Sequence, residues 1–162
     1  MTVIIGIDPG SKGGLALIVD GQLVDVEDMP MIDKRVNVAV LAAWITEHHR
    51  THGITKVTIE NVHSMPGQGV ATMFRMGRSF GEAIGCVIAL GHVVEFVPPQ
   101  TWKKAMGLTK RAGETTAQSK SRSRQLATDL YPSWSQTFKR VQDDGRAEAV
   151  LIATYGRSTV TP

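Results

Sequence analysis

A long apolar run is absent from this chain of 162 residues: no stretch of about 18 or more apolar residues occurs, which argues against a membrane-spanning helix. Residues 1–5 lack the basic region and cleavage site of a signal peptide, and we expect them to begin a strand instead. Cysteine is represented only by Cys86, which excludes a disulfide within one chain and favours a reducing, cytoplasmic environment. The apolar helical pattern around Cys86 predicts a buried packing thiol rather than a nucleophile.

Histidines in a zinc-binding spacing are also absent. The adjacent His48 and His49, expected on a helix, cannot face one metal ion together.

Charge is unevenly distributed along the chain: residues 103–124 contain seven lysines and arginines against the single acid Glu114, so this segment carries +6 and the remainder −3 of the total of +3. Such a concentration of positive charge is typical of a polyanion-binding surface, and a solvated helix face is the alternative.

Hydrophobic periodicity predicts an α/β chain. The apolar run at residues 3–7 suits a strand buried on both faces, Asp20-Gly21 is a two-residue hairpin signal, and Pro30 ends the sheet pattern. A hairpin meander that leads into β-α-β crossovers gives a five-stranded mixed sheet flanked by helices, and we expect residues 1–162 to form a single domain. Strands are expected over residues 3–7, 15–19, 22–28, 55–60 and 92–97, and helices over residues 36–51, 70–90, 115–130 and 144–155, with a short helical piece near Trp102.

Two acidic residues follow apolar strands directly. Asp8 ends the first expected strand and Glu60 ends the fourth, and an unpaired charge is costly at such a position. If these strands are parallel neighbours, about 4.8 Å apart, their carboxyl ends bring the two acids together, and a divalent cation would relieve the repulsion. The alternative is that each acid caps its own strand by accepting backbone hydrogen bonds.

A further acidic element lies near the end of the chain. Asp144 and Glu148 are four residues apart, which places them on one face of the expected helix, about 5–6 Å from each other. Glu148 is the only charge between Arg146 and Arg157, so it needs a partner where the helix packs on the sheet. For Asp143 we expect helix capping or dipole compensation, and it is the alternative ligand to Asp144 because helix boundaries shift by a residue or two.

Four carboxylates on two strand ends and one helix match the requirements of two-metal phosphodiester hydrolysis. Two divalent ions about 4 Å apart would activate water and stabilise the leaving oxygen. Carboxylate ligands favour Mg²⁺ or Mn²⁺ over zinc. The pattern therefore predicts a metal-dependent nuclease whose metal ligands are Asp8, Glu60, Asp144 and Glu148.

Five motifs resemble, in the same order, those of RuvC-like Holliday junction resolvases. They correspond to a first acidic motif, a second acidic strand, a glycine-bearing helix, a basic segment and a closing acidic helix. In this chain they are residues 6–10 with 13–14, residues 57–61, residues 77–83, residues 99–104 extended to Lys120, and residues 144–149. The resemblance is closer to phage-type members, for which we expect action in the host cytoplasm.

The resemblance implies an RNase H-like fold, a homodimer and paired nicks in a four-way DNA junction. It maps the metal ligands onto the four carboxylates named above and places Lys120, with Lys103 or Lys104, near the scissile phosphate. DNA contacts are expected from the basic segment, from the glycine-bearing helix and from the residue three places after Glu60. These residues are Lys103, Lys104, Lys110, Arg111, Lys120, Arg122, Arg75, Arg78 and His63.

The chain departs from the bacterial pattern at two places. It closes with Asp144 and Glu148 four residues apart, where bacterial members tend to have two aspartates three apart. His63 stands where the family often carries an aromatic residue that stacks on junction bases, and histidine also stacks. The loop over residues 64–69 follows directly, and we expect it to contact the substrate.

Glycines recur every fourth residue on the helix expected over residues 70–90. Each of Gly77, Gly81 and Gly85 destabilises the helix by about 1 kcal/mol relative to alanine. We therefore expect close packing of another element against these glycines to compensate. The approaching element is either the sheet beneath or a partner helix in a dimer. Apolar side chains for either contact are Met73, Phe74, Met76 and Phe80, whereas Trp102 and Trp134 are expected in the core.

Three other functions fit parts of the pattern. An RNase H-like nuclease acting on RNA or RNA–DNA hybrids would use the same carboxylates, and a junction-binding protein without activity would share the basic surface. Residues 8–13 superficially resemble the nucleotide loop of actin-like and sugar-kinase ATPases, but those proteins need two such domains, so no nucleotide cofactor is expected. The sequence therefore predicts a Mg²⁺-dependent crossover junction endonuclease.

Overall fold

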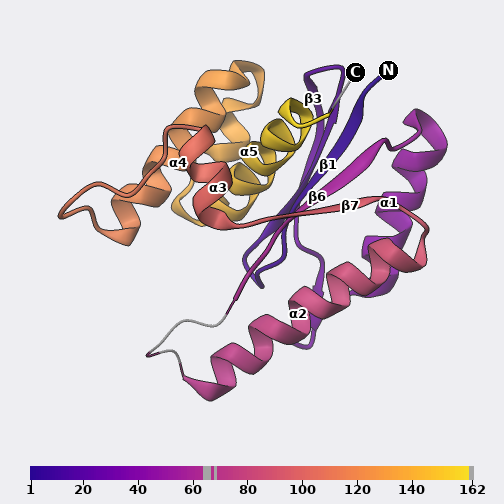
Figure 1. Cartoon of the computed structure of the whole chain (residues 1–162), viewed down its shortest axis with the longest axis horizontal. Helices are drawn as coiled ribbons and strands as arrows, with labels where there is room; N and C mark the ends of the chain where they lie inside the picture. The colour runs from indigo at the N-terminus through magenta and orange to yellow at the C-terminus, as the bar shows by residue number, and fades with distance from the viewer. Residues whose placement is uncertain (64–66, 68, 161–162) are drawn as a thin grey trace.

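A five-stranded mixed sheet forms the centre of the fold (Figure 1). The computed structural model describes residues 1–63, 67 and 69–160. The strand order is β3-β2-β1-β6-β7, in which β1 pairs antiparallel with β2 and parallel with β6, so the meander and the crossover strands share one sheet as predicted. The strands are β1 (Val3–Asp8), β2 (Gly14–Val19), β3 (Gln22–Asp28), β6 (Lys56–Glu60) and β7 (Val94–Val97).

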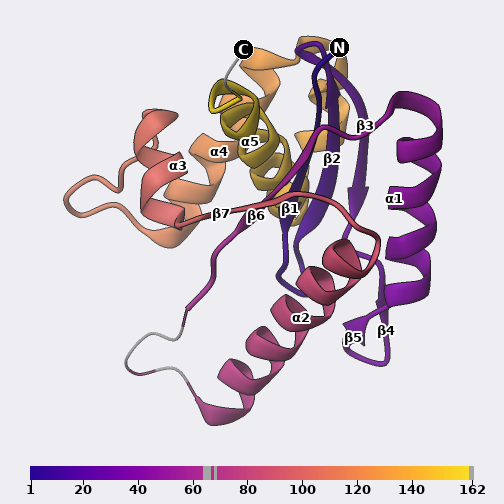
Figure 2. The same cartoon turned by 45° about the vertical axis from the view of Figure 1, so that its right-hand side comes forward.

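Helices cover both faces of the sheet and enclose two cores (Figures 1 and 2). The helices α1 (Val38–His52) and α2 (Val70–Ala89) pack on one face. The other face carries α3 (Pro99–Ala105), α4 (Thr116–Leu130) and α5 (Asp144–Ser158). Side chains of β1 alternate between the two cores. Ile5 lies in the core on the side of α1 and α2, and Ile4 lies in the core on the side of α3, α4 and α5, as the pleat of a strand requires.

The close packing of α5 on β1 depends on a glycine in the strand. A Cβ atom at Gly6 would lie 2.2 Å from the carbonyl oxygen of Ala149 and 2.7 Å from the Cβ of Ala153. Only the absence of a side chain lets the helix axis come this near to the sheet. Since β1 ends at Asp8 and α5 begins at Asp144, this contact determines how far apart the acidic residues of the two elements lie.

The structure adds elements that the sequence pattern did not predict. A two-stranded hairpin, β4 (Met31–Ile32) with β5 (Arg35–Val36), follows Pro30, and its turn residues Asp33 and Lys34 have positive φ angles of 48° and 60°. A strand of two residues is too short to show the alternation of apolar and polar residues by which strands are recognised in a sequence. Figure 2 shows this hairpin beside α2. A second unpredicted element is a 3-10 helix, η1 (Pro132–Phe138), at the place where the sequence pattern predicted only a break at Pro132.

Buried residues test several predictions. Cys86 is almost fully buried and Trp102 is fully buried, which confirms their packing roles, and Trp134 packs partly buried against the same core as Trp102.

The glycines of α2 do not approach the sheet: a Cβ at Gly77, Gly81 or Gly85 would meet no heavy atom within 4 Å. The prediction of contact with the sheet beneath is therefore wrong, because this helix packs through its opposite face. In the described part of the chain, no helix is both long and apolar enough to cross a bilayer.

Candidate active site

Two acidic residues meet at the carboxyl ends of neighbouring parallel strands, as the sequence predicted. In the register of β1 and β6, Ile7 lies opposite Ile59, so Asp8 and Glu60 are the next residues on the two strands. Asp8 Oδ1 accepts a hydrogen bond of 3.2 Å from the backbone N–H of Gly10, which fixes one carboxylate oxygen in the turn after β1. Both acids therefore lie at the same end of the sheet.

The third acid comes from α5. A Cβ atom at Gly145 would lie 2.0 Å from the carbonyl oxygen of Lys12, so the first turn of α5 rests on the turn that follows Asp8. Glu148 lies one turn further along the helix, where its carboxylate acts on the charges of both Asp8 and Glu60. The structure thus brings Asp8, Glu60 and Glu148 together.

Burial and the neighbouring negative charges raise the pKa values of Asp8 and Glu60. Burial, together with the negative charges of Glu60 and Glu148, raises the pKa of Asp8 to about 8, against the smaller opposing effects of the Gly10 hydrogen bond and Lys103. Burial and Glu148 likewise raise the pKa of Glu60, although Lys103 and Trp102 act in the opposite direction. A cluster in which adjacent carboxylates resist ionisation favours a bound cation.

Helix α3 supplies the positive and donor groups of the cluster. Lys103 Nζ lies 3.2 Å from Glu148 Oε1, and the indole Nε1 of Trp102 donates a hydrogen bond of 3.1 Å to Glu60 Oε1. The Lys103 ammonium also lies 5.0 Å from the centre of the Trp102 ring, a cation–π distance. Sequence reasoning treated Trp102 as a core residue only. Its position next to Lys103 in a helix that starts at Pro99 was the available signal for this second role.

The fourth predicted ligand, Asp144, is held by cations from α4. Lys120 Nζ lies 3.2 Å from its Oδ2, and Arg124 Nη1 contacts its Oδ1. Among residues 1–63, 67 and 69–160, no three Asp, Glu, His or Cys side chains lie close enough together to enclose a metal ion. The predicted set is therefore divided: Asp8, Glu60 and Glu148 interact, whereas Asp144 lies one turn before Glu148 in an ion-paired state.

The neighbouring Asp143 is buried at the N-terminus of α5, but its side chain makes no capping hydrogen bond to that helix. Its Oδ2 accepts a hydrogen bond of 2.8 Å from the backbone N–H of Arg140, and its Oδ1 lies 2.8 Å from Arg140 Nη2. Burial alone would raise the pKa of Asp143, but the hydrogen bonds and charge of Arg140 outweigh it and hold the pKa below its usual value. Asp143 thus caps the short 3-10 turn η2 (Val141–Asp143) that leads into α5.

The predicted basic residues divide into exposed and internally paired groups. Lys104, Lys110 and Arg111 are exposed, the last two in the loop between α3 and α4. Arg122 instead binds Glu114 at 2.9 Å and donates to the carbonyl oxygen of Gly107 at 2.9 Å, so it holds the ends of this loop together. The structure thus gives Arg122 a loop-fixing contact in addition to its predicted contact with DNA.

The remaining predicted DNA contacts lie around Glu60 and on α2. His63 is exposed three residues beyond Glu60, Arg75 is exposed in the second turn of α2, and Arg78 donates to the carbonyl oxygen of Lys34 at 3.0 Å. In the loop predicted to contact the substrate, residues 64–66 and 68 lie outside the described residues.

Comparison with known proteins identifies the fold. No protein-family model matches the chain. Over 98 residues, or 60% of the chain, it is 29% identical to the Holliday junction resolvase MOC1, chloroplastic, of Chlamydomonas reinhardtii, and it spans 10% of that protein's length. Among solved structures, T. thermophilus RuvC in complex with Holliday junction substrate matches with a TM-score of 0.63 and 18% identity over 98% of this chain and 97% of that chain.

A second solved structure agrees. The yeast mitochondrial Holliday junction resolvase Ydc2 matches with a TM-score of 0.58 and 12% identity over 94% of this chain and 76% of that chain. At these identities the likeness establishes the fold. The chain has the RNase H-like fold of RuvC, which confirms the predicted fold class.

Proposed function

We propose that this chain is a divalent-metal-dependent endonuclease that resolves four-way (Holliday) and other branched DNA junctions by paired nicks. The observation that carries the proposal is the meeting of Asp8, Glu60 and Glu148 at the carboxyl ends of β1 and β6 in a RuvC-like fold. The sequence similarity to the resolvase MOC1 supports the same substrate. Exposed cations at Lys104, Lys110 and Arg111 supply a surface for the DNA backbone.

By donor type the site suits Mg²⁺ or Mn²⁺, and its carboxylates would have to draw closer together to enclose an ion. Carboxylate oxygens are the ligands these hard cations prefer, and burial with the nearby charges of Glu60 and Glu148 raises the pKa of Asp8, which a bound cation would offset. Asp8, Glu60 and Glu148 would hold the metal, with Asp144 as the fourth ligand. When bound, two such ions activate water and stabilise the leaving oxygen.

The side chains of the chain itself orient the carboxylates and offset charge. Trp102 holds one oxygen of Glu60 by its indole N–H, which fixes the rotation of that carboxylate. Lys103 and Lys120 each lie 3.2 Å from an acid of the set, and we assign to them the offsetting of charge that would develop on the scissile phosphate.

Replacement of Trp102 by phenylalanine tests this orienting role. Trp102→Phe keeps most of the buried volume but removes the hydrogen bond to Glu60, so the cleavage rate at saturating protein should fall about tenfold while junction affinity is unchanged. The matched control is Trp134→Phe, which alters a tryptophan that packs against the same core. Equal rates for both variants and wild type, in single-turnover assays, would show that Trp102 only packs.

A homodimer is part of the proposal, with α2 as its interface. Gly77, Gly81 and Gly85 open toward solvent, and Val70, Phe74 and Ile88, which are exposed, continue the same face at helical spacing. A contiguous apolar face with room for close approach is typical of a helix–helix contact, and two-fold dimers are the commonest oligomers. Two copies joined here would present two sites for symmetric cutting.

A charge on this face should separate the protomers. Gly81→Glu meets no clash within the chain and improves helix propensity, so the variant should fold and sediment as a monomer where wild type sediments as a dimer. Ala43→Glu, on the exposed side of α1, is the control and should remain dimeric. A wild-type monomer in analytical ultracentrifugation would refute the interface.

The substrate class is tested with a panel of end-labelled nucleic acids. In Mg²⁺ we expect cleavage of a four-way junction, and little cleavage of a linear duplex of the same sequence. Preferential cleavage of an RNA–DNA hybrid or of RNA would instead identify an RNA-directed nuclease. Binding of the junction without cleavage in Mg²⁺ or Mn²⁺ would identify a junction-binding protein.

A further inference from the structure

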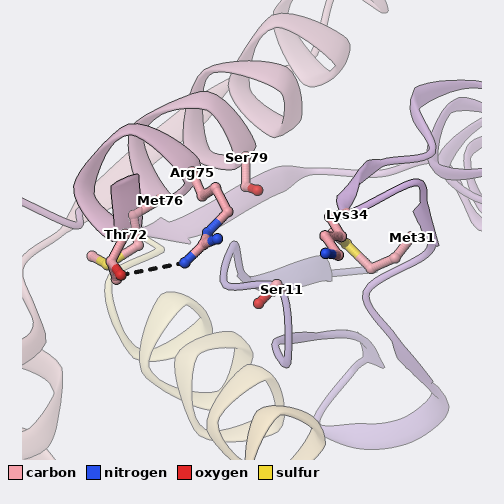
Figure 3. A pocket seen from close by; sticks show the side chains of 7 residues that line it. All are labelled: Ser11, Met31, Lys34, Thr72, Arg75, Met76 and Ser79. Atoms are coloured by element: carbon pink, nitrogen blue, oxygen red, sulfur yellow. Dashed lines mark hydrogen bonds between the residues drawn. The ribbon is translucent and has the colours of Figure 1, made fainter. Parts of the chain in front are cut away.

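We infer that a cavity beside the carboxylates, between α2, the β4–β5 hairpin and the turn after β1, binds a second phosphodiester group of the DNA. Its volume is about 510 Å³, and its polar lining includes Ser11, Lys34, Thr72 and Arg75 (Figure 3). The inference rests on the proposed function, because it assigns this cavity to the same substrate. The cavity would bind a phosphodiester group other than the one that is cleaved.

The cavity is positively charged. Lys34 and Arg75 are its charged lining residues, and none of the described residues that line it is acidic. Within the described residues neither cation forms an ion pair, whereas their neighbours Arg35 and Arg78 both lie near Glu82, at 2.8 and 3.9 Å. Two uncompensated cations that face one hollow repel each other, and an anion between them would relieve that repulsion.

The walls of the cavity are held in place by the surrounding chain. The β4–β5 turn is bound to α2 by the hydrogen bond of 3.0 Å from Arg78 to the carbonyl oxygen of Lys34, and by the hydrogen bond of 3.0 Å from the backbone N–H of Val36 to Glu82. On the opposite wall, Arg75 Nη2 donates to Thr72 Oγ1 at 3.3 Å. These contacts fix the backbone of the turn that carries Lys34 and the direction of the Arg75 guanidinium, so part of the lining is in place before any ligand arrives.

The lining matches the chemistry of a phosphodiester. A guanidinium binds two phosphate oxygens at once, an ammonium adds a compact charge, and hydroxyl groups donate further hydrogen bonds. Figure 3 shows Arg75 and Lys34 on opposite sides of the hollow with Ser11 between them. A volume of about 510 Å³ is that of pockets that hold a whole small ligand, which leaves room for a phosphate with its attached sugars.

The position of the cavity relates it to DNA. Ser11 belongs to the turn that begins at Asp8, whose Oδ1 is bound by the N–H of Gly10 in that same turn. A strand whose scissile phosphate is bound at the carboxylates would pass this turn as it leaves the site. We assign the cavity to a phosphate of that strand or of the strand that exchanges with it.

The experiment compares Lys34→Gln and Arg75→Gln with the control Arg50→Gln, in which the changed residue is an exposed arginine near the end of α1, paired with Glu47. Junction affinity is measured by fluorescence anisotropy in EDTA over a range of salt concentrations. Each test variant should lose affinity about tenfold and reduce the slope of log K against log[salt] by about 1, with the control unchanged. Lys34→Arg, which keeps the charge, should restore most of the affinity.

Cleavage at saturating protein separates this inference from the proposed function. The Lys34→Gln variant should cleave the bound junction within about threefold of the wild-type rate, because the cavity holds the strand and does not cut it. Affinities and salt slopes equal to those of Arg50→Gln would overturn the inference even if the wild type resolves junctions. If instead the wild type binds junctions through Lys34 and Arg75 but never cuts them, the cavity stands and the proposed nuclease function fails.

Discussion

Asp8→Asn and Glu148→Gln are each expected to lower the rate of junction cleavage by about 10²–10³-fold or more, while junction affinity stays within about threefold of wild type. Both changes keep the size and shape of the side chain and remove a charge that the proposed metal ion would require. Folding should survive, because neither new amide adds volume beside Gly10 or Lys103, the groups that the acids now contact. The loss is therefore one of chemistry rather than of structure.

The measurement is single-turnover cleavage of an end-labelled four-way junction in Mg²⁺, with binding followed separately in EDTA. The control is Glu47→Gln, which removes an exposed carboxylate on α1 whose partners among the described residues, Arg50 and Thr51, lie on the same helix. This variant should cleave at the wild-type rate. Wild-type cleavage by either Asp8→Asn or Glu148→Gln would mean that the metal site has been assigned to the wrong residues.

Metal-free protein is expected to lose stability as the pH rises from about 5 to 8, and Asp8→Asn is expected to lose less. The pKa of Asp8 is raised from 3.8 to about 8, so between these values the folded state retains a proton that the unfolded state has released. Stability therefore is greatest below the unfolded value and falls as the pH approaches the folded value. Asparagine has no proton to lose, so the variant lacks this contribution.

Thermal unfolding in a buffer free of divalent cations measures the effect. Between pH 5 and pH 8 the Tm of wild type should fall by at least about 3 °C more than that of Asp8→Asn, since about 1 kcal/mol corresponds to about 2–4 °C in a chain of this size. Titratable groups away from Asp8 are the same in both proteins, so their contributions cancel in the difference. Added Mg²⁺ or Mn²⁺ at pH 8 should raise the Tm of wild type more than that of the variant. Parallel curves for the two proteins would contradict the crowding of carboxylates around Asp8.

The positions of the two strand acids could be predicted from the sequence because their cause is local. An apolar run that ends in a single acid predicts a buried strand with a carboxylate at its end, and Asp8 and Glu60 both follow this pattern. Right-handed crossover connections then make β1 and β6 parallel neighbours. Glu148 followed from helical spacing, since it is the only charge in an otherwise apolar stretch of α5.

Contacts between distant segments were beyond sequence reasoning. The hydrogen bond from Trp102 to Glu60 joins residues 42 positions apart, and the ion pairs of Asp144 depend on where α4 packs against α5. Neither contact leaves a periodic signal. The glycines of α2 show the same limit: their spacing predicted a close approach, but only the packing of the opposite helix face revealed that the approach is not to the sheet.

The most direct test of the account is the cleavage of a four-way junction by wild-type protein, with both pairs of opposing strands labelled. We predict symmetric nicks near the branch point in two opposing strands, which require Mg²⁺ or Mn²⁺, stop in EDTA and return when the metal is restored. Cleavage that persists in EDTA would contradict a carboxylate metal centre at Asp8, Glu60 and Glu148. An intact junction, bound but uncut in either metal, would contradict the nuclease function itself.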